Sequence, residues 1–312
     1  MKPETLKSLL DAVRASSGSA VPVVMGPTAA GKSELAFALA RECGGEIVSA
    51  DSMQFYRGLD VGTAKPTPEE RRLVPHHLID TLDIAEKSDV FRFRADAMKA
   101  IADIRSRGRL PIVAGGSGLY LHALVYGLDV LPAKQELRDE LDAKYDNDAH
   151  FPELAAVMER ECPADFRRFY PHRRKLIRAR EVFLLSGKQI SELQTGDSAP
   201  DPMFAQFVLV RERADLVARI RRRAEIMLES GWIEEARMML AKGLLNAPTA
   251  WQAIGYAQIG DYLAGKLTRA ELLESIVIAT RQFARRQSTW FRNRHKEATF
   301  LSVPSDEGQV LP

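Results

Sequence analysis

The sequence predicts an α/β fold: a phosphate-loop core with a parallel sheet and flanking helices, a mostly helical insertion and a helical C-terminal part. Two observations lead to this class. The eight residues Gly26–Ser33, GPTAAGKS, match the pattern GxxxxGK[ST] of a phosphate-binding loop. Apolar runs alternate with helical patterns along the first part of the chain, at residues 21–25, 32–42, 46–50, 90–108 and 110–116. Such alternation is typical of a parallel sheet, in which ligands bind beyond the carboxyl ends of the strands.

The phosphate loop lies directly between the apolar run at 21–25 and the helical pattern at 32–42. Its glycines allow successive backbone N–H groups to turn toward an anion, and the N-terminus of the following helix favours negative charge. Lys32 adds a cation, and the hydroxyl of Ser33 is a ligand for Mg²⁺. We therefore predict a phosphate or diphosphate site here.

The second and third strands end differently from those of common nucleotide-hydrolysing proteins. The third strand runs into AGGSG and carries no acid that could hold magnesium, whereas the second ends at Asp51. Three interpretations of Asp51 stay open on this pattern: a metal-holding acid, a general base, or a solvated residue that caps the next turn.

The order of the patterns predicts four parts. They are an N-terminal helix and linker at 1–20, the α/β core at 21–133, a helical insertion at 134–203, and the resumed core with C-terminal helices at 204–312. In the insertion, charged helical patterns precede a polar linker, TGDSAPDP, at 195–202. After it we expect a strand and then helices, at residues 204–210, 213–230, 232–242 and 269–292.

Composition indicates an ordinary soluble protein of 312 residues, with 46% hydrophobic residues, 28% charged residues and a net charge of +2. The two cysteines, Cys43 and Cys162, lie far apart without metal-ligand spacing, which favours a reducing compartment. No apolar stretch suits a signal peptide or a membrane span. We therefore expect a cytoplasmic protein, without membrane contact, that acts as a monomer.

Basic residues gather in three runs, at 167–180, 219–223 and 281–296. Each run alone is explained by a solvated helix face, but three in a nearly neutral protein favour a groove for a polyanion. In the last run, Phe283 and Phe291 accompany the arginines, where they either stack on unpaired bases or belong to the core. Arg219 and Arg223 are one helical turn apart beside apolar positions, so they border the packed face of their helix.

Six segments, taken in order, resemble the bacterial tRNA dimethylallyltransferases. They are GPTAAGKS, SADSMQFYRGLDVGTAKP, PHHLID, AGGSGLYLHALVYGL, AIGY and TRQFARRQSTWFRN. The resemblance covers most of residues 21 to 293 and implies a phosphate-loop core with a helical tRNA-binding insertion. It also implies a Mg²⁺-dependent transfer of a dimethylallyl group from dimethylallyl diphosphate to N6 of adenosine 37, beside the anticodon of tRNA.

The resemblance implies roles for particular residues. Asp51 would be the base that accepts the proton from N6, and Lys32 and Arg223 would stabilise the departing diphosphate. The diphosphate would be bound by Gly26, Pro27, Thr28, Ala29, Ala30, Gly31, Lys32 and Ser33, with Mg²⁺ on Ser33. Near the flipped adenine, tRNA would contact Asp51, Ser52, Met53, Gln54, Ser117 and Arg138. Elsewhere it would contact Arg174, Lys175, Leu176, Ile177, Arg178, Gln252, Ala253, Ile254, Gly255, Tyr256, Arg285, Arg286, Gln287 and Arg292.

Three other functions are compatible with parts of the chain. An ATP-dependent small-molecule kinase would use the same loop but leaves the basic and aromatic C-terminus unexplained. An isopentenyltransferase acting on free adenine nucleotides would need no groove for an anticodon. A non-catalytic RNA-binding protein would leave the phosphate loop unexplained.

Overall fold

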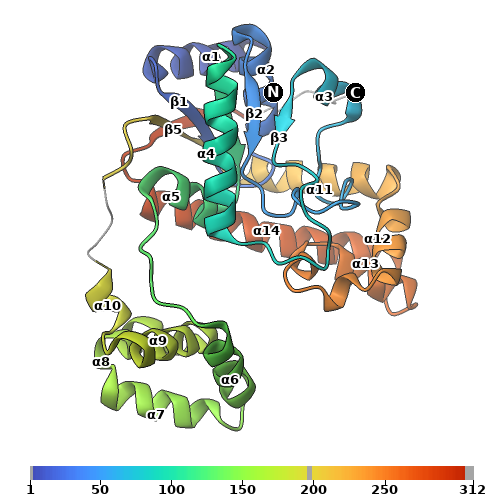
Figure 1. Ribbon diagram of the computed structural model, residues 1–312. Helices are drawn as coiled ribbons and strands as arrows, with labels where there is room; N and C mark the ends of the chain where they lie inside the picture. The colour runs from blue at the N-terminus through green and yellow to red at the C-terminus, as the bar shows by residue number, and fades with distance from the viewer. Residues whose placement is uncertain (1–2, 195–198, 306–312) are drawn as a thin grey trace. The chain divides into compact units, whose positions relative to one another are not determined.

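The computed structural model describes residues 3–194 and 199–305 (Figure 1). The chain divides into two compact units, one formed by Met1–Val125 with Pro200–Pro312 and the other by Tyr126–Ala199. Half of the polar linker predicted at 195–202, residues 195–198, lies outside the described residues. The helical unit begins eight residues earlier and ends four residues earlier than the insertion predicted at 134–203.

In the described part of the first unit, six strands form one parallel sheet in the order β3-β2-β4-β1-β5-β6. The strands are β1 (Val21–Met25), β2 (Glu46–Ser49), β3 (His76–His77), β4 (Pro111–Gly115), β5 (Phe204–Arg211) and β6 (Thr299–Val303). The central strand β1, with the sequence VPVVM, is buried along its whole length, as continuous apolar strands of a sheet covered on both faces should be. The α/β fold predicted from the sequence is confirmed.

Two edge strands were not predicted, and both lack the apolar pattern of a central strand. β3 is only His76–His77, and both residues are partly exposed. β6 has three exposed residues among its five, and it forms because Phe207 to Arg211 of β5 offer it a parallel partner. The backbone of the neighbouring strands supplies hydrogen bonds to β3 and β6. These two strands therefore form although their own sequences do not predict them.

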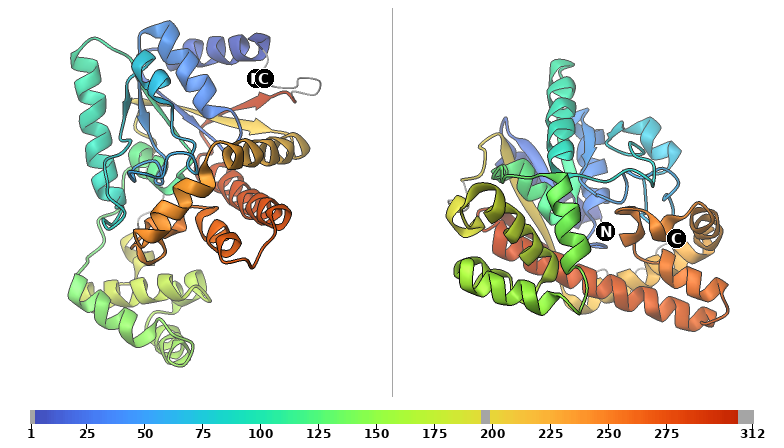
Figure 2. Two further views of the ribbon diagram at one scale, coloured as in Figure 1. Left: turned by 90° about the vertical axis from the view of Figure 1, so that its right-hand side faces the viewer. Right: turned by 60° about the horizontal axis from the view of Figure 1, so that its bottom comes forward.

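Helices cover both faces of the sheet (Figure 2). On one face, α1 (Pro3–Ser17) and α2 (Lys32–Cys43) share an apolar cluster with the strands. Leu35 and Leu39 of α2 are almost fully buried in it, and each such side chain contributes about 1.5–3 kcal/mol by its removal from water. The opposite face is covered by α4 (Val90–Ser106), where Asp89 caps the first turn by accepting hydrogen bonds from two backbone N–H groups.

Besides α1, α2 and α4, the described part of this unit contains six further α-helices. They are α3 (Pro68–Leu73), α5 (Gly118–Tyr126), α11 (Arg213–Glu229), α12 (Trp232–Ala241), α13 (Tyr256–Leu263) and α14 (Arg269–Arg294). α14 packs against both α11 and α13, and α12 packs against α13 (Figure 1). Two single turns of 3₁₀-helix, Leu244–Asn246 and Ala250–Gln252, connect α12 to α13.

The helical unit has its own apolar core, made largely by Leu154, Met158, Leu176, Ile177 and Val182. Its helices are α6 (Gln135–Tyr145), α7 (Phe151–Glu161), α8 (Pro163–Phe169), α9 (Arg173–Ser186) and α10 (Ile190–Leu193). Over residues 3–194 and 199–305, no helix combines the length and the apolarity that crossing a bilayer requires.

Candidate active site

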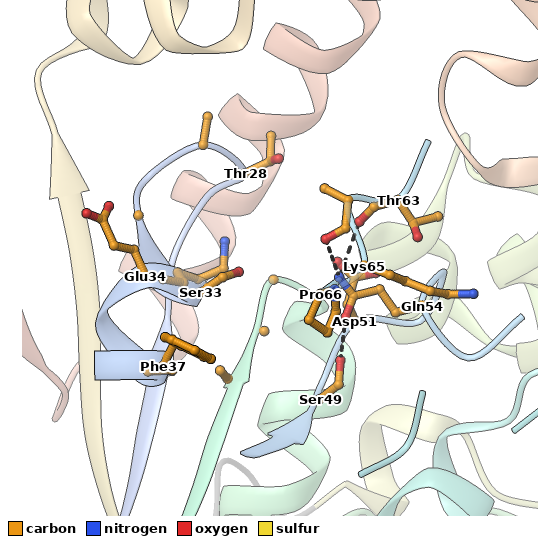
Figure 3. A pocket seen from close by; sticks show the side chains of 18 of the residues that line it. Thr28, Ser33, Glu34, Phe37, Ser49, Asp51, Gln54, Thr63, Lys65 and Pro66 are labelled. Atoms are coloured by element: carbon orange, nitrogen blue, oxygen red, sulfur yellow. Dashed lines mark hydrogen bonds between the residues drawn. The ribbon is translucent and has the colours of Figure 1, made fainter. Parts of the chain in front are cut away.

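A cavity of about 710 Å³ opens at the carboxyl edge of the sheet. It is lined by the phosphate loop, the end of β2, residues 63–66, the end of β4, and side chains from α11 and α14. Figure 3 shows Thr28 and Ser33 on one side of it, with Asp51, Gln54 and Thr63 facing them from the other. The loops after three separate strands thus meet here, as the parallel order of the sheet requires.

The phosphate loop is held in shape by cationic side chains bound to its carbonyl groups. Lys32 donates to the carbonyl of Pro27 at 2.8 Å, and Arg219 of α11 donates to that of Ala29 at 3.0 Å. The buried Arg211, at the end of β5, donates to the carbonyl of Ala30 at 3.1 Å. These bonds fix the backbone of the loop before any ligand binds, so it does not have to be ordered on binding.

The end of the loop depends on glycine. Gly31 has φ +100°, in the left-handed region that side chains rarely adopt, and α2 begins at the next residue. The loop therefore delivers Lys32 and Ser33 into the first turn of a helix, where backbone N–H groups favour an anion.

The cations beside the loop, Lys32 and Arg223, are half-buried. The pKa of Lys32 is lowered to about 8, mainly by burial; the charge of Asp51 opposes this shift and the charge of Arg223 adds to it. Burial also lowers the pKa of Arg223, again against the charge of Asp51. Arg223 reaches the hydroxyl of Thr28 at 3.4 Å and, with Arg219, lines the cavity. The negative charge of a bound polyanion would offset the cost of this desolvation, so the arrangement suits a diphosphate.

Asp51 lies at the first turn after β2, half-buried in the wall of the cavity. Its carboxylate accepts a hydrogen bond from the N–H of Met53 at 3.0 Å, and its carbonyl accepts one from the N–H of Gln54 at 3.1 Å. Because its charge acts on the pKa of both Lys32 and Arg223, the carboxylate lies within electrostatic range of the anion site. An acid and an anion site therefore share one cavity.

Ser52, Gln54 and Ser117 form the surroundings of Asp51. The hydroxyl of Ser117, after β4, accepts from the N–H of Ser52 at 2.9 Å and lies 3.2 Å from its hydroxyl. The amide of Gln54 accepts from the hydroxyl of Ser49 at 2.9 Å and donates to the carbonyls of residues 63 and 64. The structure thus brings together, around the end of β2, residues that the sequence analysis grouped near the adenine.

Gln287 of α14 differs from the neighbouring residues predicted to contact tRNA. It is buried, its amide oxygen accepts from the N–H of Thr28 at 2.8 Å, and its amide nitrogen donates to the carbonyl of Gly116 at 2.8 Å. The side chain therefore joins the phosphate loop to the end of β4. Arg285, Arg286 and Arg292 on the same helix are exposed.

The segment Gln252–Tyr256 is divided in the same way. Gln252 is exposed and Ile254 is half-buried, whereas Ala253, Gly255 and Tyr256 are buried. The hydroxyl of Tyr256 donates to Glu235 of α12 at 2.7 Å. Contact of this segment with RNA stays a prediction, and the side chain of Tyr256 is engaged inside the protein.

In the helical unit, the predicted tRNA-binding residues fall into three groups. Arg174 and Lys175 of α9 are exposed, whereas Leu176 and Ile177 are buried in the core of that unit. Any contact of these two with RNA would have to involve backbone atoms. The third group consists of two arginines, Arg138 and Arg178.

Arg138 and Arg178 share one buried carboxylate, that of Glu181. Arg138 donates to it at 2.9 Å and Arg178 at 2.6 Å, and the hydrogen bonds from both arginines lower the pKa of Glu181 against its burial. Arg178 also donates to the carbonyl of Pro132 at 2.9 Å. One carboxylate compensates part of the charge of two guanidinium groups, which leaves less net charge for a polyanion.

Two residues that shape the site, Arg211 and Glu235, were not predicted from the sequence. Arg211 is a charged residue at the end of the apolar strand β5, which pairs with β1, the strand that precedes the phosphate loop. Glu235 lies in the pattern WIEEARMML beside an exposed glutamate, and no sequence signal distinguishes the two.

A metal would find few ligands from the chain itself. Over residues 3–194 and 199–305, no group of three or more His, Cys, Asp or Glu side chains could hold a metal ion. Ser33 and Asp51 both line the cavity. This donor set suits a hard cation such as Mg²⁺, which keeps several waters and takes other ligands from the phosphates of a substrate.

Comparison with known families shows two matches. Residues 54–294 match the family model described as IPP transferase, and residues 19–86 match that described as isopentenyl transferase. Among curated proteins, the chain is 46% identical over 289 residues to a tRNA dimethylallyltransferase of Methylococcus capsulatus, covering 91% of this chain and 92% of that protein. A protein of the same name from Thermotoga maritima is 39% identical over 293 residues, covering 93% of this chain and 95% of that protein.

Among solved structures, the chain is similar to enzymes with related names. The chain is similar to the tRNA isopentenylpyrophosphate transferase of Bacillus halodurans, with a TM-score of 0.65 and 36% identity, covering 92% of this chain and 90% of that one. It is also similar to a eukaryotic dimethylallyltransferase described as acting on tRNA, with a TM-score of 0.78 and 27% identity. That alignment covers 94% of this chain and 75% of the other.

Proposed function

Because this chain belongs to the IPP transferase family, we propose that it transfers a dimethylallyl group from dimethylallyl diphosphate to N6 of adenosine 37 in tRNA, releasing diphosphate. The relatives named above are tRNA dimethylallyltransferases, and one structural neighbour is described as acting on tRNA. The observation that carries the proposal is that Asp51 shares its cavity with the cations of the phosphate loop.

The donor side follows from the phosphate loop. Breaking the allylic C–O bond leaves the electron pair on the diphosphate and positive charge on the carbon. The N–H groups at the start of α2, with Lys32 and Arg223, would stabilise the negative charge of the leaving group. Because Lys32, Arg219 and Arg211 already hold the loop, this stabilisation needs little rearrangement.

The acceptor side follows from Asp51. The lone pair of adenine N6 forms the new C–N bond, and the nitrogen then loses one proton. Asp51 would accept that proton, which contributes about 10²–10⁴ in rate for a positioned base. The adenosine has to leave its stack to reach the cavity, at a cost of a few kcal/mol that is lower in a loop than in a duplex.

We propose that Mg²⁺ binds beside the phosphate loop, at Ser33. The hydroxyl of Ser33 would hold Mg²⁺ together with diphosphate oxygens and water, and the ion would supply charge neutralisation for the diphosphate. The exposed cations of α14 and α9, namely Arg285, Arg286, Arg292, Arg174 and Lys175, would contact the tRNA phosphates.

The direct test offers the protein dimethylallyl diphosphate, Mg²⁺ and unmodified tRNA, with N6-prenylated adenosine measured by mass spectrometry. Parallel reactions replace the tRNA with AMP, or the donor with ATP. Prenylation of AMP would favour the free-nucleotide enzyme, and consumption of ATP without prenylation would favour a kinase.

Asp51→Asn sharpens this test, because asparagine keeps the shape of the side chain but cannot take the proton. We expect the single-turnover rate to fall about 10²–10⁴-fold, with the affinity for tRNA retained. The variant Asp83→Asn is a control, because Asp83 is an exposed acid outside the lining of the cavity. A loss of tRNA affinity as large as the loss of rate would show that Asp51 binds rather than reacts.

A further inference from the structure

Glu235 of α12 is a buried carboxylate that accepts four hydrogen bonds. One oxygen accepts from the N–H groups of Asp60 at 2.8 Å and Val61 at 2.7 Å. The other accepts from the N–H of Gly62 at 2.9 Å and the hydroxyl of Tyr256 at 2.7 Å. Three successive backbone N–H groups that converge on one anion form a nest, here filled by a side chain from a distant helix.

The fit at this contact is close. A Cβ on Gly62 would lie 2.2 Å from Nε1 of Trp232 and 2.5 Å from the hydroxyl oxygen of Tyr256, so only glycine allows the backbone to approach α12. Burial, followed by the charge of Glu235, raises the pKa of Tyr256. The phenol therefore keeps its proton and remains a donor to the carboxylate.

The segment held by Glu235 continues into the wall of the cavity. Residues 63–66 line it, and Figure 3 shows Thr63, Lys65 and Pro66 on the same side as Asp51. Ala64 has φ +47°, a left-handed conformation that residues other than glycine rarely adopt. The surrounding hydrogen bonds must hold this backbone in place, since the local sequence does not favour it.

A second set of hydrogen bonds links this wall of the cavity to the turn that carries Asp51. The side-chain amide of Gln54 donates to the carbonyls of Thr63 at 3.2 Å and Ala64 at 3.3 Å. The backbone N–H of Gln54 donates to the carbonyl of Asp51 at 3.1 Å. Hydrogen bonds and the backbone between them therefore connect Glu235, through residues 60–64 and Gln54, to Asp51.

We propose that Glu235 is a positioning residue for the acceptor side of the active site. Its carboxylate holds residues 60–66 in the position from which they support Gln54 and Asp51 against the acceptor base. The phosphate loop is held by a separate set of side chains, namely Lys32, Arg219 and Arg211. This inference rests on the transfer to tRNA proposed above. It predicts that loss of Glu235 impairs the acceptor half of the reaction and leaves the donor half intact.

The variant Glu235→Gln tests it, because the amide keeps the volume but turns an N–H₂ group toward N–H donors. We expect kcat to fall on the order of 100-fold, as for a displacement of about 1 Å in a reacting geometry. The KM for dimethylallyl diphosphate and the affinity for pyrophosphate, measured by calorimetry, should stay at their wild-type values. Tyr256→Phe removes one of the four hydrogen bonds to Glu235. It should give a smaller fall in kcat, again with an unchanged KM for dimethylallyl diphosphate and an unchanged affinity for pyrophosphate.

Glu234→Gln is the matched control, because the neighbouring glutamate of α12 is 69% exposed and pairs with Arg237. A wild-type kcat in Glu235→Gln would overturn the proposal. So would a joint loss of kcat, pyrophosphate affinity and melting temperature, which indicates general unfolding. If the unaltered protein fails to prenylate tRNA, the proposed function is overturned first, and this inference with it.

Discussion

Arg219 and Arg223 beside the phosphate loop and Arg174 and Arg178 of the helical unit come from similar basic runs, yet they are used differently. Arg219 and Arg223 of α11 line the cavity and bond to the phosphate loop, Arg219 through a carbonyl and Arg223 through a hydroxyl. In the helical unit, Arg138 and Arg178 bond to Glu181, while Arg174 is exposed. Basic residues thus build an anion site, stabilise a fold, or offer charge to solvent, according to the partner that the fold provides.

The largest expected effect in this comparison concerns Arg223. Arg223→Ala removes a desolvated positive charge beside the leaving group, and we expect kcat to fall about 10²–10³-fold. Stopped-flow or quench-flow measurement of diphosphate release would give the rate. Arg221→Ala is the control, because Arg221 lies on the same helix but pairs with Glu274, and it is not part of the cavity lining. An unchanged kcat with only a raised donor KM would mean that Arg223 contributes to ground-state binding alone.

The next effect is a dependence on pH. Since burial lowers the pKa of Lys32 to about 8, the amine is charged below pH 8 and loses its proton as the pH rises. The kcat/KM for dimethylallyl diphosphate should therefore be level below pH 8 and fall by about tenfold for each pH unit above it. Lys32→Arg keeps its charge over this range and should remove the fall. If the fall persists in Lys32→Arg, another group titrates.

The smallest effect compares two arginines of α9. Arg174→Ala should lower the slope of log affinity for tRNA against log salt by about 0.7–0.9, the loss of one phosphate contact. Arg178→Ala should change that slope less, because Glu181 already compensates part of its charge, but should lower the melting temperature of the helical unit. Binding isotherms over a salt series and thermal unfolding would separate the two. Equal changes in slope would show that the ion pair with Glu181 opens on binding.

Much of the sheet was predictable because its central strands carry their own signal. VPVVM is a continuous apolar run followed by GPTAAGKS, and together they fix a buried strand, a loop and a helix start. The edge strands β3 and β6 carry no such signal, because their formation depends on the neighbour that pairs with them. Local pattern predicts structure where the residues themselves are buried on both faces.

The candidate site was predictable to a different extent on its two sides. Asp51 and Gly26–Ser33 follow strands, so the parallel order alone predicts that they meet. Gln287 illustrates the opposite case. It lies among exposed arginines in TRQFARRQSTWFRN, and only the packing of α14 against the phosphate loop turns its amide inward.

The sequence by itself determined the phosphate loop, the parallel sheet and the convergence of Asp51 with Lys32, because the alternation of apolar strands with helices and the chemistry of the loops are local properties of the chain. Only the tertiary structure decided which charged residues act at the cavity and which stabilise the fold. Glu235 and Glu234 are adjacent glutamates of one helix, and burial beneath the N–H groups of residues 60–62 separates them. The physical reason is that the environment of a charge depends on distant backbone and side chains, which the spacing of residues along a helix does not encode.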